Sequence, residues 1–355
     1  ETADPYLPVK GWKSAPNPED VARAIELLLS AQKPLIYAGE GVIYAGASAE
    51  LTSFAELANT PVISTLKAKG AFPENNPLFV GVRGDQVDEY LAKSDLILAV
   101  GSSLSPGRFS HGIPNAVNKT IIHCTVDELH VNKSYPTAVA LIGDARFALQ
   151  ALEKELSDKT SGNGRAPGSV AAEVTSSRDS AMVQYREAMA STDTPINPYR
   201  VYAGLMDVLD PLNSFVTHES GNTRDQLSTV YDTLVPRGFL GWGNVSSLGF
   251  SLAATIAAKI SFPQKHCVAV TGEAGLGYMM GNLEVPLRQK LGITVAHVSN
   301  GGFAGYGPGF WGDGHDPFTH KVLGNDEVDM SQVIGALGYH TERVTEPSEV
   351  GPALK

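Results

Sequence analysis

The sequence predicts an α/β protein built from two doubly wound parallel sheets. Short apolar runs alternate with helical stretches over residues 19–156 and again over residues 196–355, which is the pattern of parallel strands connected by crossover helices. Residues 157–178, between these regions, are rich in Ser, Gly, Thr and Ala and have no apolar period, so a linker is predicted there. With 355 residues, of which 43% are hydrophobic, the chain is long enough to bury two cores.

The first α/β region follows a proline-rich start. Residues 1–18 contain four prolines and little periodicity, which predicts an extended connector. Asn17, followed by Pro18 and two acidic residues, predicts the start of an amphipathic helix over 21–31, because an Asx cap and acids in the first turn stabilise a helix N-terminus. The strands predicted after it cover 35–38, 62–65, 96–100, 120–124 and 138–142, and the helices cover 47–58, 87–94 and 146–156.

The second region follows a predicted helix over 181–190. Its strands are predicted at 214–217, 267–271, 293–298 and 341–344, and its long helices at 198–209 and 248–258. A last helix is predicted from Ser348 onward, and a further strand would normally follow Lys355. We therefore expect this domain to be incomplete at its C-terminal end.

Composition narrows the possible function classes. The formal net charge is −11 and no run of Lys and Arg is present, which argues against a nucleic-acid partner. No apolar run approaches the roughly 20 residues that span a bilayer, and the first residues lack the features of a signal peptide, so we expect a cytoplasmic protein. Cys124 and Cys267 lie in apolar runs and are expected to be buried without a disulfide.

Two predicted strands of the second region end in residues suited to a metal-bound diphosphate. The apolar run 268–271 is followed by Gly272 and Glu273, and the run 293–298 is followed by Ser299, Asn300 and two glycines. Neighbouring parallel strands present their carboxyl ends at one edge of a sheet. Mg²⁺ prefers hard oxygen ligands, of which the protein usually supplies few, and helix N-termini attract phosphate. The spacing therefore predicts a site for Mg²⁺ on a diphosphate.

This segment resembles the signature of thiamine diphosphate (ThDP) enzymes, in which Gly-Asp-Gly is followed at this spacing by Asn-Asn. Residues 245–254 are similar to the Gly-x-Gly-Phe-x-Leu-Pro-Ala-Ala segment of acetolactate synthase and decarboxylase relatives, and residues 33–39, 69–73 and 142–145 are similar to their central domain. The chain is thereby identified as a member of the family. The resemblance implies a central domain over 19–156 and a domain over 196–355 that binds the diphosphate and Mg²⁺.

The resemblance also implies the residues of the site. Glu273, Asn300 and the carbonyl of Gly302 would hold Mg²⁺. Leu248 would brace the cofactor in its bent shape, and the carbonyl of Ser246 would accept from its 4′-amino group. A plain core position is the alternative interpretation for Leu248. The other implied cofactor contacts are Gly272, Ala274, Gly275 and Tyr306.

A further segment, Ser220, Gly221, Asn222 and Thr223, follows a predicted strand and opens a helix. Small residues and exposed N–H groups there suit a diphosphate oxygen. A simple helix cap is the alternative interpretation.

Three residues depart from the family signature. The acid is Glu273 rather than Asp, Ser299 replaces the first Asn, and Ala274 replaces a Gly that could adopt positive φ without cost. These departures leave open a second hypothesis, in which the chain is a non-catalytic binding or regulatory protein with a decayed cofactor site.

The loop over 305–319 is aromatic and Gly-rich and is expected to lie over the cofactor. His315 and His320 are candidate general acids or bases because the pKa of histidine lies near neutrality, and the alternative is that the loop only shapes a lid. A transition-metal trio of His315, Asp316 and His320 is a third possibility. The four large aromatic residues of this loop predict an interface between copies of the chain.

In the first region, Gly39-Glu40-Gly41 follows a predicted strand, as in a dinucleotide-binding fingerprint, but the third glycine falls at Gly46 and the pattern is degenerate. Family members use this domain for FAD, for CoA or another ADP-containing group, or for no ligand. The sequence leaves this choice open.

The resemblance implies an enzyme, a transferase or lyase that makes or breaks a C–C bond next to a carbonyl, like acetolactate synthase or a 2-oxo acid decarboxylase. Its substrate would be a small 2-oxo acid. The alternative within the family is a 2-hydroxyacyl-CoA or oxalyl-CoA lyase with an acyl-CoA substrate. The family's pyrimidine-binding module, which supplies a Glu to the cofactor, is expected from a missing segment or another chain, so we expect a homo-oligomer and no turnover by this chain alone.

Overall fold

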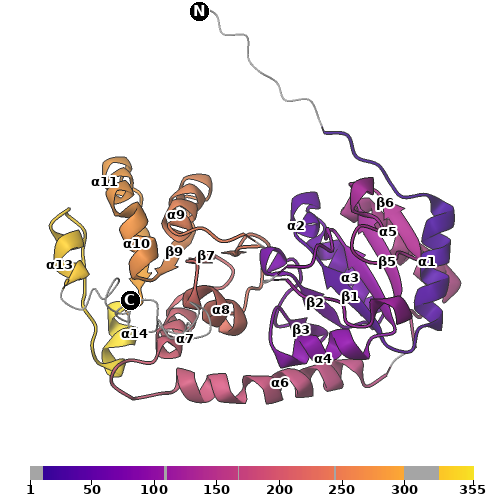
Figure 1. Cartoon of the computed structure of the whole chain (residues 1–355), viewed down its shortest axis with the longest axis horizontal. Helices are drawn as coiled ribbons and strands as arrows, with labels where there is room; N and C mark the ends of the chain where they lie inside the picture. Colours follow the sequence, from indigo (N-terminus) through magenta and orange to yellow (C-terminus); the bar gives the residue numbers. More distant parts are fainter. Residues whose placement is uncertain (1–10, 108–109, 167, 244, 300–327) are drawn as a thin grey trace, which may run out of the picture.

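The computed structural model describes residues 11–299 and 328–355, apart from 108–109, 167 and 244. In this part of the chain the strands form two sheets, and every strand pair is parallel, which confirms the predicted fold class. Figure 1 shows the sheets side by side, with the first at the right and helix α6 running below both.

The first sheet has six strands in the order β3-β2-β1-β4-β5-β6. The strands are β1 (Pro34–Ala38), β2 (Val62–Ser64), β3 (Phe79–Gly81), β4 (Leu96–Val100), β5 (Thr120–Thr125) and β6 (Val139–Ile142). The helices that connect them are α1 (Pro18–Ser30), α2 (Gly41–Ala45), α3 (Ser48–Leu57), α4 (Asp85–Lys93) and α5 (Ala145–Lys159). As predicted, Asn17 caps α1, and its Oδ1 accepts from the backbone N–H of Glu19 at 3.0 Å.

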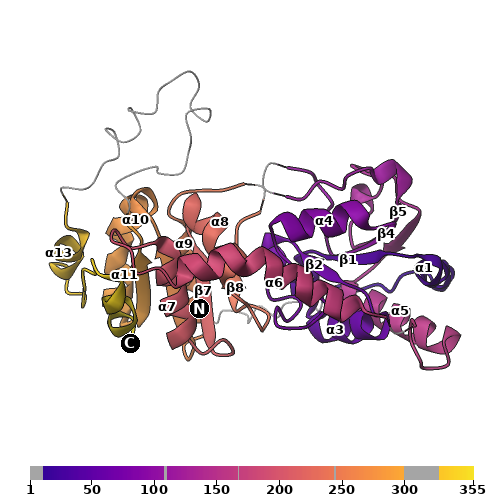
Figure 2. The same ribbon diagram turned by 90° about the horizontal axis from the view of Figure 1, so that it is seen from below.

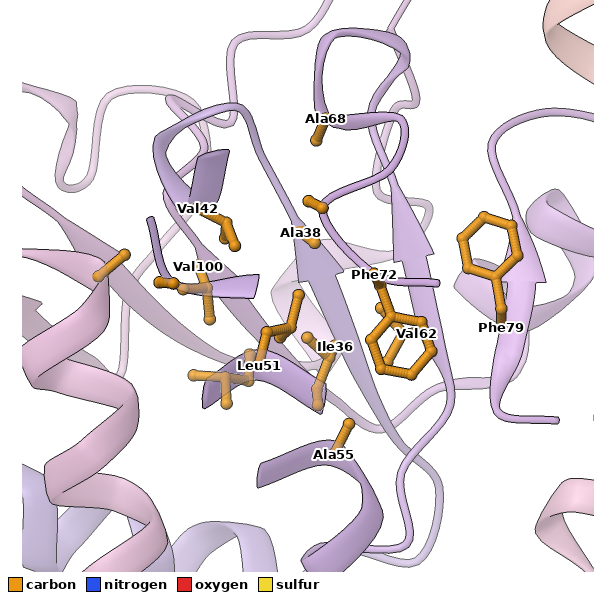
Figure 3. Close-up of a cluster of buried hydrophobic side chains, with 14 of the residues drawn as sticks. Ile36, Ala38, Val42, Leu51, Ala55, Val62, Ala68, Phe72, Phe79 and Val100 are labelled. Atoms are coloured by element: carbon orange, nitrogen blue, oxygen red, sulfur yellow. The ribbon is translucent and has the colours of Figure 1, made fainter. Parts of the chain in front are cut away.

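Alternate residues of each central strand enter separate cores, because successive side chains of a strand point to opposite faces. Ile36 and Ala38 of β1 pack in the larger core with α1, α3 and α5, while Leu35 and Tyr37 pack on the other face with α4. Figure 3 shows Ile36, Val62 and Leu51 of α3 among the side chains of the larger core. Both faces of the sheet are covered, which explains why its strands are continuous apolar runs.

The second sheet has the order β10-β9-β7-β8. Its elements are α7 (Pro198–Val208), β7 (Ser214–His218), α8 (Asn222–Val230), β8 (Phe239–Leu240), α9 (Phe250–Ser261), β9 (His266–Thr271), α10 (Glu273–Met279), α11 (Glu284–Gln289), β10 (Ile293–His297), α13 (Met330–Gly335) and α14 (Val350–Ala353). Residues 341–344, predicted to be a strand, form none. Glu342 and Arg343 between Thr341 and Val344 are exposed, and Arg343 pairs with Asp329, so this segment has no apolar face to bury against the sheet.

The predicted linker is wrong over its second half, because α6 covers Val170–Met189. Val170, Val174, Met182, Tyr185 and Met189 pack against the cores at helical spacing. Arg178 takes the place of an apolar residue in this stripe, with its guanidinium 5.4 Å from the centre of the Phe79 ring. A charged residue that buries its stem in this way hides the apolar period from sequence analysis.

Helix α6 packs against both α/β units. Val174 is buried in the core beside α4, and the Tyr185 ring lies 5.4 Å from that of Tyr199 on α7. Figure 2 shows the helix crossing from one unit to the other. None of the helices in the described residues is both long and apolar enough to cross a lipid bilayer. Cys124 and Cys267 are buried and free, as predicted.

Candidate functional site

The candidate site lies beyond the carboxyl ends of β7 and β9 in the second sheet. These strands are neighbours, but the chain leaves β7 toward β8 on one side and β9 toward β10 on the other. Such a reversal of strand order opens a crevice in which α/β proteins bind ligands. The turns that follow β7 and β9 contain the segments 220–223 and 272–275, which include the predicted cofactor contacts.

A buried carboxyl group, that of Glu219, stands at the centre of these segments. Its side chain is 1% exposed. Oε1 accepts from the backbone N–H of Ser220 at 2.9 Å, and Oε2 accepts from Oγ and N–H of Ser251 at 2.8 Å and 3.3 Å. A Cβ added to Gly275 would overlap Cγ and Cδ of Glu219. The residue therefore touches the β7–α8 turn, the first turn of α9 and α10 together.

Sequence reasoning missed Glu219, since an acid before a Ser-Gly turn ordinarily lies in solvent. The signal that was present is the small size of its later neighbours, Ser251 and Gly275.

The β7–α8 turn is shaped by a glycine of positive φ and by side-chain hydroxyl groups. Gly221 has φ 104° and ψ −146° and precedes the first residue of α8, a conformation that other residues rarely adopt. Thr223 Oγ1 donates to the carbonyl of Glu219 at 3.1 Å. The hydroxyl groups of Ser220 and Ser246 are hydrogen-bonded to each other, so the structure brings the segments 220–223 and 246–248 together. Leu248 is half-buried.

The predicted metal position also involves neighbouring strand ends. Thr271 of β9 is paired in register with His297 of β10, so Glu273 and Ser299 both lie just past the edge of the sheet. Oε1 of Glu273 accepts from Oγ of Ser299 at 3.1 Å. Asn300 and Gly302, the other predicted ligands, lie outside the described residues. Glu273 is half-buried. A carboxylate beside a hydroxyl is a hard donor pair of the kind that Mg²⁺ accepts, so the residues present fit the ion.

The backbone of the β9–α10 turn bears on two of the predicted site residues, Gly272 and Ala274. Ala274 is part of α10, so the replacement of Gly at this position carries no conformational cost. Gly272 has φ −102° and ψ −176°, and the nearest atom to a Cβ added there is the carbonyl oxygen of Val298 at 4.0 Å. The backbone at Gly272 is thus open to a ligand within the described part of the chain.

His218 links this edge of the sheet to the connection that follows β8. The ring is fully buried; Nδ1 lies 3.0 Å from the carbonyl oxygen of Glu219, and Nε2 lies 3.4 Å from the backbone nitrogen of Trp242. A carbonyl can only accept, so Nδ1 carries the proton and Nε2 accepts from Trp242. Burial lowers the pKa of His218 to about 4, which keeps the ring neutral at physiological pH.

The remaining predicted site residues belong to the aromatic loop. Tyr306, His315, Asp316 and His320 lie outside the described residues, and so do the four large aromatic side chains that motivated an interface there. Their roles stay predictions.

The glycines of the first region serve close packing of two turns. The N–H of Gly39 donates to the carbonyl of Val100, and that of Gly41 donates to the carbonyl of Gly101, both at 2.8 Å. A Cβ added to Gly39 would overlap the carbonyl of Gly101. These contacts account for the Gly-Glu-Gly sequence through the fold, and they leave the choice between FAD, a CoA or ADP group and no ligand open.

Comparisons with known proteins agree with this geometry. Residues 21–152 match the thiamine pyrophosphate enzyme central domain, and residues 219–355 match the thiamine pyrophosphate enzyme C-terminal TPP-binding domain.

Among curated proteins, the chain is 29% identical over 357 residues to a probable acetolactate synthase large subunit of Methanococcus aeolicus, covering 96% of this chain and 58% of that protein. It is 27% identical over 349 residues to oxalyl-CoA decarboxylase of Escherichia coli, covering 96% and 59%. An acetolactate synthase large subunit of Corynebacterium glutamicum is 26% identical over 374 residues, covering 99% and 57%. The chain thus spans somewhat more than half the length of these relatives. Both matched domains and the strand-end geometry lead to one conclusion: the chain belongs to the thiamine pyrophosphate enzyme family.

Proposed function

We propose that this chain is the central and cofactor-binding part of an enzyme that uses ThDP and Mg²⁺ to make or break a C–C bond next to a carbonyl. The observation that carries the proposal is the convergence of three cofactor segments at the carboxyl ends of β7 and β9 around Glu219. When bound, ThDP supplies the electron sink for such chemistry, and the protein supplies binding and orientation.

Each segment has a distinct task in this proposal. The turn at Gly221 and the open backbone at Gly272 would receive the diphosphate. Glu273 would bind Mg²⁺, with Asn300 and Gly302 as further ligands, and Ser299 would hold the carboxylate of Glu273 in place. Leu248, half-buried next to Ser246, would brace the organic part of the cofactor. Family members complete the site with a pyrimidine-binding module, so we propose that another chain or a further segment supplies it.

The substrate class has two candidates. The archaeal and corynebacterial relatives are acetolactate synthase large subunits, which favours a small 2-oxo acid. The similarity to oxalyl-CoA decarboxylase extends over the same share of the chain and favours an acyl-CoA instead. Direct assay of pyruvate and of oxalyl-CoA with the complete enzyme separates the two.

A non-catalytic protein with a decayed site is the alternative outside enzymes. The hydrogen bond from Ser299 to Glu273 motivates it, because that bond already occupies one oxygen of the proposed metal ligand.

The test is a calorimetric titration of ThDP in the presence of Mg²⁺. Replacing Glu273 by Gln exchanges a charged metal ligand for a neutral one. We expect ThDP binding to weaken by about tenfold or more, because interactions made by ionised groups are stronger than those made by neutral groups. Glu273→Asp keeps the charge and restores the family's usual residue, so its affinity should equal or exceed that of the wild type. Equal affinity in the Gln variant and the wild type would rule out Glu273 as the ligand, and no binding by any form would favour the decayed site.

A further inference from the structure

The carboxyl group of Glu219 has an unusual set of partners for a buried acid. Its two oxygens accept three hydrogen bonds, two from backbone N–H groups and one from a serine hydroxyl. No Lys or Arg of the described chain forms an ion pair with it. Burying a carboxyl group is unfavourable unless its oxygens are hydrogen-bonded. The partners that satisfy Glu219 are therefore the turns that the proposed function assigns to the cofactor.

Each partner belongs to a different cofactor segment. Ser220 begins the β7–α8 turn, whose Gly221 would receive the diphosphate. Ser251 stands in the first turn of α9, directly after the segment that contains Leu248. Gly275 lies on α10, two residues after the proposed metal ligand Glu273, and its missing side chain lets α10 approach the Glu219 stem. One side chain thus sets the spacing between the diphosphate turn, the bracing segment and the metal helix.

We propose that Glu219 is a positioning residue for the ThDP and Mg²⁺ site, acting through Ser220, Ser251 and Gly275 without touching the cofactor. This inference rests on the proposed function. Its side chain is buried and both oxygens are already engaged, so it cannot serve as a proton donor or acceptor toward a ligand in the crevice. Its task is to fix the distance between the diphosphate turn and Glu273, so that the proposed diphosphate and metal positions keep their spacing.

The carboxyl group is required because both oxygens face backbone N–H donors. Gln has the same shape, but its amide nitrogen is a donor. Whichever way the amide of Gln is turned, its NH₂ group faces either the N–H of Ser220 or that of Ser251. One turn must then move away, and the spacing of the site changes while the core around it stays filled.

The experiment compares the wild type with Glu219→Gln and with Glu284→Gln, a matched control at an exposed glutamate of α11. Calorimetry measures the affinity for ThDP with and without Mg²⁺, which gives the factor by which each ligand strengthens binding of the other. We expect Glu219→Gln to weaken ThDP binding in Mg²⁺ by about tenfold, the effect of one buried donor left without an acceptor, and to reduce the coupling factor. A residue that only stabilises the fold would lower the melting temperature and leave the coupling factor unchanged.

Amide hydrogen exchange provides a readout that needs no cofactor. Exchange at Ser220 or Ser251 should accelerate in Glu219→Gln, because one of these N–H groups loses its acceptor. Should that variant fail to fold, Ser251→Ala removes one of the three hydrogen bonds and should reduce the coupling factor by a smaller amount. Wild-type coupling and exchange in both variants would overturn the inference alone. A wild type that binds no ThDP would overturn the proposed function and the cofactor role of Glu219 with it.

Discussion

Two buried glutamates, Glu74 and Glu219, have carboxyl groups that are stabilised by different kinds of partner. Glu74 lies between the two α/β units and pairs with Lys69, which is 2% exposed. One of its oxygens accepts from the N–H of Thr233 at 2.9 Å, and the other has no hydrogen-bond partner in the described structure. Glu219 has neutral donors on both oxygens. The first acid holds two units together through a charge pair, and the second shapes a single site through directed hydrogen bonds.

The difference teaches where substitutions should act. Burial raises the pKa of the Glu74 carboxyl, against the opposing effect of Lys69, so the pair is sensitive to the loss of either charge. The Lys69 ammonium also lies 5.3 Å from the centre of the Phe239 ring. Changes at Glu74 and Lys69 should therefore affect stability first, and changes around Glu219 should affect cofactor binding first.

The largest effect is expected from Lys69→Met. This change keeps the volume of the side chain but leaves the Glu74 carboxylate buried without its cation, a loss that typically costs about 3 to 5 kcal/mol. Urea unfolding followed by circular dichroism measures it. The double variant Lys69→Met with Glu74→Gln removes both charges and should recover most of the lost stability. A Lys69→Met variant as stable as the wild type would show that Glu74 does not depend on its charge pair with Lys69.

An intermediate effect is expected from Gly275→Ala. The new methyl group would overlap the stem of Glu219, and overpacking of this kind costs about 1 to 3 kcal/mol. Gly277→Ala on the same helix is the matched control, because a Cβ there meets no atom within 4 Å in the described structure. We expect the control to keep or slightly raise the melting temperature. ThDP titrations should show weaker binding in Gly275→Ala alone, and equal binding in both variants would contradict it.

A pH effect follows from His218, next to Glu219. Its pKa is about 4 in the folded protein and about 6.5 in an unfolded chain. Between pH 6.5 and pH 4 the His218 side chain is protonated in the unfolded state but neutral in the folded state. The contribution of His218 to the free energy of unfolding is therefore fully present above pH 6.5 and is lost as the pH falls toward 4. The loss between pH 7 and pH 5 should be about 2 kcal/mol.

Urea unfolding at both pH values checks this expectation. His218→Asn should remove that part of the pH dependence, whereas His266→Gln, at an exposed position at the start of β9, should keep it. An identical pH dependence in wild type and His218→Asn would contradict the assignment to His218.

The smallest effect is expected from Arg83→Gln. Arg83 pairs with Asp225 across the two units, but the two side chains are 30% and 44% exposed. Partly exposed ion pairs contribute about 1 kcal/mol or less. The shift in the urea midpoint should be well below that of Lys69→Met. A comparable shift would show that solvent exposure does not determine how much each ion pair contributes to stability.

Much of the fold could be predicted from the sequence because parallel strands covered on both faces are continuous apolar runs. β1, β4 and β9 appear within one or two residues of their predicted positions. β3 and β8 were missed, since three and two residues are too few to show a pattern. Helix α6 begins earlier than predicted. The prediction missed its first half because Arg178 stands in the apolar stripe and hides the helical period.

The turns of the candidate site were also predictable, because glycines and small residues after apolar runs reveal strand ends. Ser220 to Thr223, Ser246 and Glu273 all lie at the expected edge of the sheet. Glu219 could not be predicted in the same way. Its burial depends on Ser251 and Gly275, which come from later segments of the chain, and no local pattern reports that they pack against it.

Helix α6 has a consequence for how the protein loses its structure. It packs on β3 and α4 in one unit and on α7 in the other, and Arg178 from its middle donates to the carbonyl of Glu74 at 2.5 Å and to Asp232 at 2.9 Å. Fraying of this helix would uncover apolar surface in both units at once. Regions that share such an element open together as one cooperative unit, so we expect a single unfolding transition rather than two.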